Sequence, residues 1–248
     1  MNLIVDDLLI NYELMGKGKA VLLLHGWGDS ARTFKALAQD LSKSYLIISL
    51  DLPGFGHSEA PKTVWNLDNY AVFLDHFLSK LAIQPYAVIG HSNGGALAIR
   101  AIAISKLKAS KLVLLAASGI RNKHGLKRIG LKIVAKTGKA ATLWLPSGYR
   151  QRLRQRLYGT IGSDLLVVPS LQETFKQTVR QDVQADAAKL SIPTLLIFAD
   201  QDPAIPLADG RTYNQLIKKS DLKIMHSANH FVHHDQPEQV LTLIKEFL

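Results

Sequence analysis

The sequence contains no cysteine, which excludes disulfide bonds, thiolate metal sites and a cysteine nucleophile. It also contains no apolar run near the roughly 18 residues that a membrane-spanning helix requires. No repeat period and no long polar tract is visible, so a solenoid or a disordered chain is not expected. The first seven residues lack the basic flank and apolar run of a signal peptide. We therefore expect a cytoplasmic protein without a transmembrane segment.

The composition favours a compact globular protein, because 47% of the 248 residues are hydrophobic and only 20% are charged. The formal charge of +10 is concentrated in the window 121–180, where 13 lysine and arginine residues accompany two acidic ones. This window has neither a zinc-finger pattern nor interleaved aromatic residues, so we do not expect nucleic-acid binding. Three interpretations of it stay open: an anionic substrate, contact with a membrane surface, or a solvated basic face.

Short apolar runs alternate with helical patterns along most of the chain. The runs that are typical of strands buried on both faces are 20–24, 45–50, 86–89, 111–116 and 193–198, and 222–225 is expected to be a further strand. Apolar stripes at helical spacing lie in 34–41, 70–81 and 240–248. The pattern predicts an α/β protein with a doubly wound, mostly parallel sheet, whose ligands lie beyond the carboxyl ends of the strands.

Two local predictions accompany this scheme. The segment 8–14 is expected to be an antiparallel strand at the edge of the sheet. Asp235 with Glu238 has the spacing of a capping box at the start of the last helix.

The alternation fails between about residues 118 and 189, where helical patterns are weak and glycine and proline interrupt them. We expect an α/β core made of 1–118 and 190–248. The residues 119–189 would then form an inserted helical lid, or cap, over the ends of the strands.

The strongest chemical signal is Gly90-His91-Ser92-Asn93-Gly94, which lies directly between an apolar strand and a helical segment. A tight strand-to-helix turn needs glycine on both sides, because larger neighbours would block the strained conformation of the serine. The Ser92 hydroxyl would then project alone as a nucleophile. The alternative is a glycine-rich turn that contains a bystander serine.

A serine hydroxyl is a poor nucleophile at neutral pH, so this interpretation requires a histidine base and a carboxylate to orient it. Asp202 follows the strand 193–198, and His230 follows the strand 222–225. The order Ser-Asp-His along the chain is the one that accompanies this kind of turn.

Other residues compete for these roles. Asp200 is the alternative acid and is expected to be a solvated loop residue. The alternative bases are His226, His233 and His234, of which the last two are expected on the surface where a helix begins. These histidines show no ligand spacing with carboxylate support, so we expect no metal site.

Three further polar residues are expected to have structural roles. His25 would brace the loop after the first parallel strand by hydrogen bonding. Asp51 would cap the turn that follows its own strand. His91 would only fill space in the turn before Ser92.

The chain resembles the α/β-hydrolase superfamily along nearly its whole length, apart from the insertion. The motifs that carry the resemblance are His25–Gly28 as oxyanion loop, Asp51–Ser58 as the turn after the next strand, Gly90–Gly94 as nucleophile elbow, Asp202–Pro206 as acid loop, and His230 with Phe231 as base segment. Asn93 departs from the family, which more often has an apolar residue there. The departure leaves the hydrogen-bond donor intact, because that donor is the backbone amide.

The resemblance implies a serine hydrolase with Ser92, Asp202 and His230 as its catalytic triad and the backbone amides of Trp27 and Asn93 as its oxyanion hole. It implies no cofactor and a small-molecule substrate with an ester-like bond, cleaved as by a carboxylesterase, lactonase or thioesterase through an acyl-enzyme. A C–C bond hydrolase or a cofactor-free peroxidase on the same triad is an alternative. A hydrolase-fold receptor that binds a ligand with little turnover is another.

Overall fold

The computed structural model describes residues 1–121 and 171–248. The chain divides into two compact units, one of Met1–Gly119 with Asp164–Leu248 and one of Ile120–Ser163. Every element below belongs to the first unit. No helix among the described residues has the length and apolar content needed to cross a membrane.

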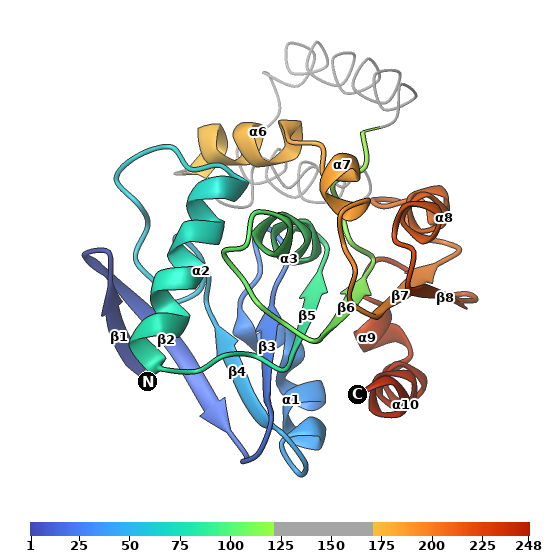
Figure 1. Ribbon diagram of the computed structural model, residues 1–248, viewed down its shortest axis with the longest axis horizontal. Helices are drawn as coiled ribbons and strands as arrows, with labels where there is room; N and C mark the ends of the chain where they lie inside the picture. The colour runs from blue at the N-terminus through green and yellow to red at the C-terminus, as the bar shows by residue number, and fades with distance from the viewer. Residues whose placement is uncertain (122–170) are drawn as a thin grey trace, which may run out of the picture. The chain divides into compact units, whose positions relative to one another are not determined.

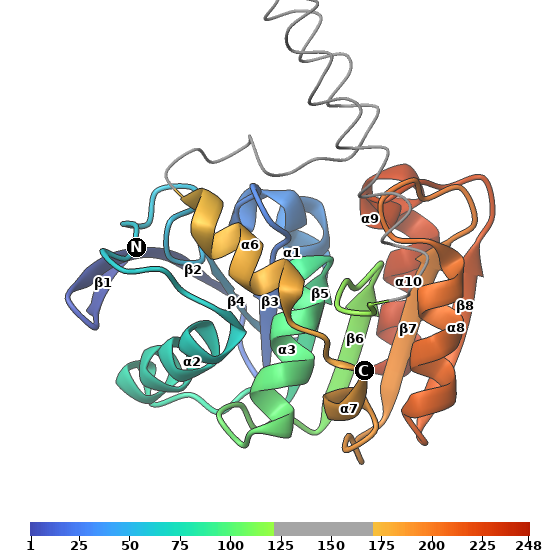
Figure 2. The same cartoon turned by 90° about the horizontal axis from the view of Figure 1, so that it is seen from above.

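A sheet of eight strands forms the centre of the described part of the chain. The strands are β1 (Asn2–Val5), β2 (Leu8–Met15), β3 (Ala20–Leu24), β4 (Leu46–Leu50), β5 (Ala87–His91), β6 (Lys111–Leu115), β7 (Thr194–Ala199) and β8 (Ser220–Met225). Their order across the sheet is β1-β2-β4-β3-β5-β6-β7-β8, and Figure 2 shows them side by side in this order. Strands β1 and β2 are antiparallel to their neighbours, whereas β4, β3, β5, β6, β7 and β8 are parallel.

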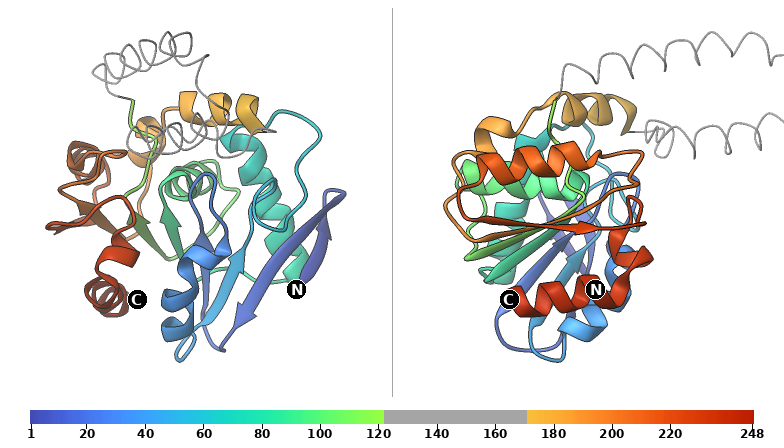
Figure 3. Two further views of the ribbon diagram at one scale, coloured as in Figure 1. Left: turned by 180° about the vertical axis from the view of Figure 1, so that it is seen from behind. Right: turned by 90° about the vertical axis from the view of Figure 1, so that its right-hand side faces the viewer.

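Helices cover both faces of the sheet. They are η1 (Ala31–Phe34, a 3₁₀ helix), α1 (Lys35–Leu41), α2 (Leu67–Leu81), α3 (Asn93–Ala103), α6 (Gln172–Arg180), α7 (Gln184–Ala187), α8 (Leu207–Leu216), α9 (Val232–Asp235) and α10 (Pro237–Phe247). Helices α1, α9 and α10 lie on one face, and α2, α3 and α8 lie on the other (Figures 1 and 3). The central strands β3, β5 and β7 are buried along their full length, which explains their continuous apolar runs.

The prediction of a doubly wound, mostly parallel sheet is confirmed. The prediction that 8–14 forms the edge strand is wrong, because β1 pairs with the outer side of β2. The two strands are joined at Asp6 and Asp7, both of which have positive φ angles, 51° and 61°. A two-residue hairpin turn of this kind usually contains glycine or asparagine, so Asp-Asp gives a weak sequence signal.

The predicted capping box at the last helix is also wrong. Helix α10 begins at Pro237 after Gln236, and no side chain caps it. Asp235 ends the short helix α9 instead, and its carboxylate accepts a hydrogen bond from the Asn229 amide.

The predicted division into a core and a lid at 119–189 stays a prediction, since most of that insertion lies outside the described residues. Its last part contains α6 and α7. Helix α6 is connected to the segment before α2, because the Trp65 amide donates to Thr174 Oγ1 and the Leu67 amide donates to Gln181 Oε1.

Candidate active site

Four loops that follow parallel strands carry the predicted site residues. Trp27 follows β3, Ser92 and Asn93 follow β5, Asp202 follows β7 and His230 follows β8. Parallel strands end at the same edge of a sheet, so residues that are distant in sequence lie at one edge here.

Ser92 occupies a strained backbone conformation between β5 and α3, with φ 51° and ψ −118°. Its amide donates to Leu115 O at 3.0 Å, and its carbonyl accepts from the amides of Gly95 and Ser118, each at 3.0 Å. A positive φ at a non-glycine residue costs on the order of 1–3 kcal/mol and persists only where the surroundings enforce it. The end of β6 therefore helps to hold the serine in place.

The glycines around Ser92 are required by close backbone contacts. A Cβ on Gly90 would lie 2.7 Å from Gly94 O, and one on Gly94 would lie 2.1 Å from Leu24 O. Gly95 packs against Ala117, where a Cβ would approach the alanine Cβ to 2.5 Å. Because of these contacts, the first turn of α3 lies directly against the ends of β3 and β6.

His230 and Asp202 are joined by a hydrogen bond, with His230 Nδ1 donating to Asp202 Oδ2 at 2.7 Å. The other carboxylate oxygen, Oδ1, accepts from the amides of Ala204 and Ile205 at 2.7 and 2.9 Å. The Asp202 side chain is fully buried, so its orientation is fixed on both sides. Nε2 of His230 is left as the ring atom that can accept a proton.

Asp200, the alternative acid, binds a different histidine. Its Oδ2 accepts from His226 Nδ1 at 2.9 Å, and its Oδ1 accepts from the Ser227 amide. The His226 side chain is largely exposed. Of the two carboxylates in this loop, only Asp202 reaches His230.

The described residues include no hydrogen bond between the Ser92 hydroxyl and His230. The residue before Ser92 does contact the histidine, since the ring of His91 lies 4.8 Å from the ring of His230, centroid to centroid. Contacts between nucleophile and base are often long in a ligand-free site and shorten when substrate binds.

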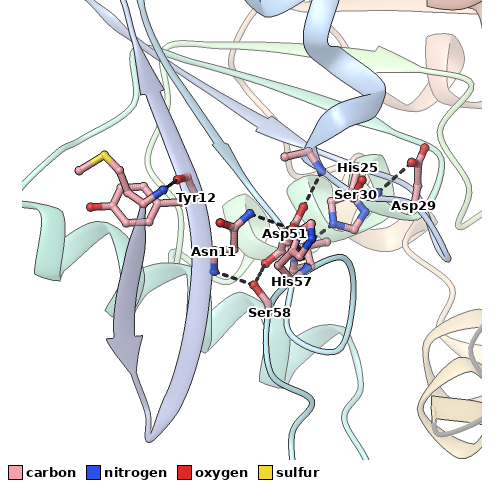
Figure 4. Close-up of polar contacts among 11 residues, drawn as sticks. Asn11, Tyr12, His25, Asp29, Ser30, Asp51, His57 and Ser58 are labelled. Carbon is pink, nitrogen blue, oxygen red and sulfur yellow. Dashed lines mark hydrogen bonds and ion pairs between the residues drawn. The ribbon is translucent and has the colours of Figure 1, made fainter.

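His25 braces the loop after β3, as the sequence predicts. Its Nδ1 donates to Gly26 O at 2.8 Å. Its Nε2 accepts from the Leu52 amide at 2.9 Å (Figure 4). Both ring nitrogens are thus used, and burial lowers the pKa of His25. A Cβ on Gly26 would lie 3.2 Å from Ser92 Cβ, so this loop passes directly beside the serine.

Asp51 holds the turn after β4, again as predicted. Its carboxylate accepts hydrogen bonds from the amides of Ala31 and His57 and from the side chain of Asn11 (Figure 4). Burial acts to raise the pKa of Asp51, but these hydrogen bonds outweigh it and lower the pKa below its ordinary value. Asp51 is therefore a structural carboxylate.

The amides predicted to form the oxyanion hole follow two neighbouring strands, Trp27 after β3 and Asn93 after β5. Asn93 is the first residue of α3, and the first amides of a helix have no acceptor within that helix. The Trp27 amide follows Gly26, which packs against Ser92. The two amides therefore belong to segments that include or contact the Ser92 turn, and their role as an oxyanion hole stays a prediction.

A cluster of histidines packs against His230. His91, His233 and His234 pack in series, with ring centroids 4.9 and 4.3 Å apart. The prediction that His233 lies on the surface is wrong: it is buried, and its Nε2 bonds to Thr33 Oγ1 at 3.2 Å. His234 is exposed. No group of three acidic or histidine side chains suited to a metal ion occurs among the described residues.

The sequence did not indicate a group of packed aromatic side chains beside the loop after β3. The Trp27 ring packs between Phe55 and Phe175, with centroid distances of 4.8 and 5.0 Å. Leu171 fills the space above Gly54, where a Cβ would come within 2.4 Å of its Cδ1. Phe175 and Leu171 lie in the part of the sequence with weak helical periodicity, so only their apolar character could have indicated this contact.

A cavity of about 290 Å³ lies beside η1 and α1. Its lining includes Arg32, Lys35 and His234 but none of the predicted catalytic residues. It opens next to the outer end of the histidine cluster rather than at Ser92.

Comparison of the sequence with known proteins identifies the family to which the chain belongs. Residues 21–243 match the profile of the alpha/beta hydrolase family. YugF, an uncharacterised hydrolase of Bacillus subtilis (strain 168), is 25% identical over 261 residues that cover 98% of this chain and 96% of YugF. The pimeloyl-(acyl-carrier protein) methyl ester esterase of Chromobacterium violaceum is 26% identical over 253 residues, covering 90% of this chain and 92% of that esterase.

A solved structure has a similar fold. The meta-cleavage product hydrolase CumD from Pseudomonas fluorescens IP01, in a variant complexed with acetates, superposes with a TM-score of 0.76. The match covers 100% of this chain and 96% of CumD at 22% sequence identity.

Proposed function

Because the chain belongs to the alpha/beta hydrolase family, we propose that it is a serine hydrolase that cleaves an ester-like bond through an acyl-enzyme on Ser92. The observation that carries the proposal is the buried Asp202–His230 hydrogen bond beside a serine with a positive φ angle. A serine on such a strained turn is typical of a hydrolase nucleophile, and the carboxylate fixes the histidine that would activate it.

In this mechanism His230 Nε2 removes the proton of Ser92 Oγ as the oxygen attacks the carbonyl carbon of the substrate. Asp202 keeps the proton on Nδ1 and stabilises the imidazolium that forms. His230 then gives the proton to the leaving alcohol, and the acyl group stays on Ser92. A water molecule deprotonated by His230 releases the acid and restores the serine.

The amides of Trp27 and Asn93 would stabilise the oxyanion of each tetrahedral intermediate. One such donor contributes about 3 kcal/mol in comparable sites. His25 supports this role, since its two hydrogen bonds hold the loop that presents Trp27.

The residues beside the oxyanion loop favour an apolar acyl group. The ring of Trp27 packs with those of Phe55 and Phe175 into an uncharged group, and Trp27 directly follows Gly26, which lies against Ser92. The named activity of the Chromobacterium violaceum relative is also ester cleavage. Carboxylesterase, lactonase and thioesterase activity are all compatible with this site. The likeness to CumD keeps a meta-cleavage product hydrolase as the second candidate.

Labelling with a fluorophosphonate tests the proposal, because the reagent phosphonylates only an activated serine. We expect one label per chain, located on the peptide that contains Ser92, and no label on Ser92→Ala. Ser105→Ala, which changes an exposed serine at the end of α3, should label as the wild type does. A folded wild-type protein that takes up no label would overturn the proposal and favour a ligand-binding receptor.

A substrate panel then separates the reaction types. Aryl esters with acyl chains of increasing length, thioesters and lactones are compared with a meta-cleavage dienoate, each against Ser92→Ala. Ester hydrolysis that increases with acyl length supports the proposed class. Turnover of the dienoate alone would move the assignment to the second candidate.

A further inference from the structure

His91 connects parts of the site that its position in the sequence does not indicate. It is the residue before Ser92, so its backbone belongs to the nucleophile elbow. Its side chain is buried and its ring packs against His230, Phe231 and His233. The ring therefore projects from the elbow into the loop that carries the proposed base.

A single hydrogen bond joins the two segments. His91 Nε2 donates to the backbone carbonyl of His230 at 3.1 Å. Within residues 1–121 and 171–248, no other hydrogen bond connects the elbow 90–94 with the base loop 226–231. This bond is therefore the direct polar link between the elbow and the base loop among the described residues.

The remaining hydrogen bonds of the base loop lead elsewhere. The Gln201 amide donates to Ala228 O, which ties the loop to the acid loop. The Ser227 amide binds Asp200, and the Asn229 amide binds Asp235 of α9. These contacts fix His230 relative to Asp202 but not relative to Ser92.

The other side of the His91 ring contacts the oxyanion loop. A Cβ on Gly26 would lie 3.1 Å from His91 Nδ1, so the ring packs directly against the Gly26 backbone. His91 Nδ1 itself is buried and has no hydrogen-bond partner. A buried ring nitrogen without a partner costs about 1–3 kcal/mol, so packing alone would be better served by an apolar side chain.

We propose that His91 is a positioning residue, whose Nε2–H bond to the His230 carbonyl sets the distance between the serine hydroxyl and the base imidazole. This inference rests on the proposed function of Ser92 and His230. In this proposal His91 neither binds substrate nor transfers a proton. It acts by holding the base loop against the elbow.

The test compares two substitutions of similar length. His91→Gln keeps an N–H donor near the position of Nε2, whereas His91→Met keeps the bulk and removes the donor. His233→Met is the matched control, because it removes an equally buried histidine of the same cluster whose hydrogen bond goes to Thr33. Each protein is measured for the rate of fluorophosphonate labelling, for kcat and KM on an aryl ester, and for Tm.

We expect the labelling rate and kcat of His91→Met to fall by about 10- to 100-fold, since a displacement of about 1 Å has effects of this size. KM should change little, because the bond does not contact substrate. His91→Gln should recover the rate to within about threefold of the wild type, and His233→Met should match the wild type in rate even if its Tm falls. Equal rates for His91→Gln and His91→Met would overturn the inference.

A second measurement covers the case in which His91→Met does not fold. In wild-type protein, ¹⁵N–¹H correlation of the imidazoles should show His91 as the Nε2–H tautomer, with the signal absent in His91→Gln. An Nδ1–H tautomer would contradict the proposed bond. Failure of the wild type to label would instead refute the proposed function, whereas normal labelling with a rate-neutral His91→Met would refute this inference alone.

Discussion

Two carboxylates separated by one residue, Asp200 and Asp202, bind histidines in the same way and differ in their surroundings. Each accepts from an imidazole Nδ1, at 2.9 Å from His226 and at 2.7 Å from His230. The Asp202 side chain is 0% exposed, whereas that of Asp200 is 32% exposed. Water and salt screen the exposed pair, so only the buried pair can hold an imidazole firmly in one tautomer.

Asp202→Asn should therefore lower kcat for an aryl ester by about 10³- to 10⁴-fold, because an amide cannot hold the proton on Nδ1 of His230. Asp200→Asn should stay within about threefold of the wild type and serves as the matched control. Steady-state kinetics on both variants, with Ser92→Ala as background, checks the assignment. A larger loss in Asp200→Asn than in Asp202→Asn would reverse the roles of the two residues.

At the residue scale, the three candidate catalytic residues could be found in the sequence because each of them follows a predicted strand. Ser92, Asp202 and His230 each follow an apolar run, and parallel strands bring such positions to one edge. The contacts of His91 and the burial of His233 could not be predicted in this way. Both depend on how the segment after β8 folds back over β5, and neighbouring histidines carry no apolar period that would indicate burial.

At the scale of elements, Arg100 joins three helices on one face of the sheet. From α3 it donates to Asp68 of α2 at 2.6 Å and to both carboxylate oxygens of Asp186 in α7 at 3.0 Å. The Asp186 side chain is only 6% exposed, so its charge depends on this partner and on the more distant Lys189. Lys106 and Asp75 form a comparable bridge between α2 and the end of α3, with both side chains 39% exposed.

Arg100→Met should lower the free energy of unfolding by about 2–3 kcal/mol, because it leaves the buried Asp186 without the Nη1 donor that reaches both of its oxygens. Lys106→Met should change it by less than about 0.5 kcal/mol, since that pair is open to solvent. Urea unfolding of the wild type and both variants measures the two changes in the free energy of unfolding, provided that the m-value is the same for all three proteins. Equal losses would show that burial does not set the contribution of these bridges.

The elements themselves were predictable where packing on both faces leaves a continuous apolar run. The run 20–24 coincides with β3, and the runs for β4 to β7 agree within two residues at each end. Predictions failed where a local signal competed with tertiary contacts. Asp235 has a capping spacing but binds the Asn229 amide, because the chain makes the extra helix α9 before α10 begins.

At the scale of the whole molecule, the composition predicted a compact α/β core but not the role of the basic window. Most of the window 121–180 lies outside the described residues, so an anionic substrate, a membrane surface and a solvated face all stay predictions, as does a cytoplasmic location. What the described part does show is a core that encloses polar groups. One apolar cluster of this core includes residues from β3 to β8 and from α1, α9 and α10.

The enclosed histidines should make the whole fold sensitive to acid. Burial lowers the pKa of His91 and lowers that of His233 to about 3, whereas in an unfolded chain it is about 6.5. The unfolded state therefore binds more protons below about pH 6.5, and the free energy of unfolding falls as the pH drops from there towards 3. Between pH 6.5 and 5.5, the free energy of unfolding of His233→Gln should fall by about 1 kcal/mol less than that of the wild type. Urea unfolding at each pH measures this difference. Above pH 7.5 both proteins should show the same pH dependence, and identical slopes below pH 6.5 would contradict the expectation.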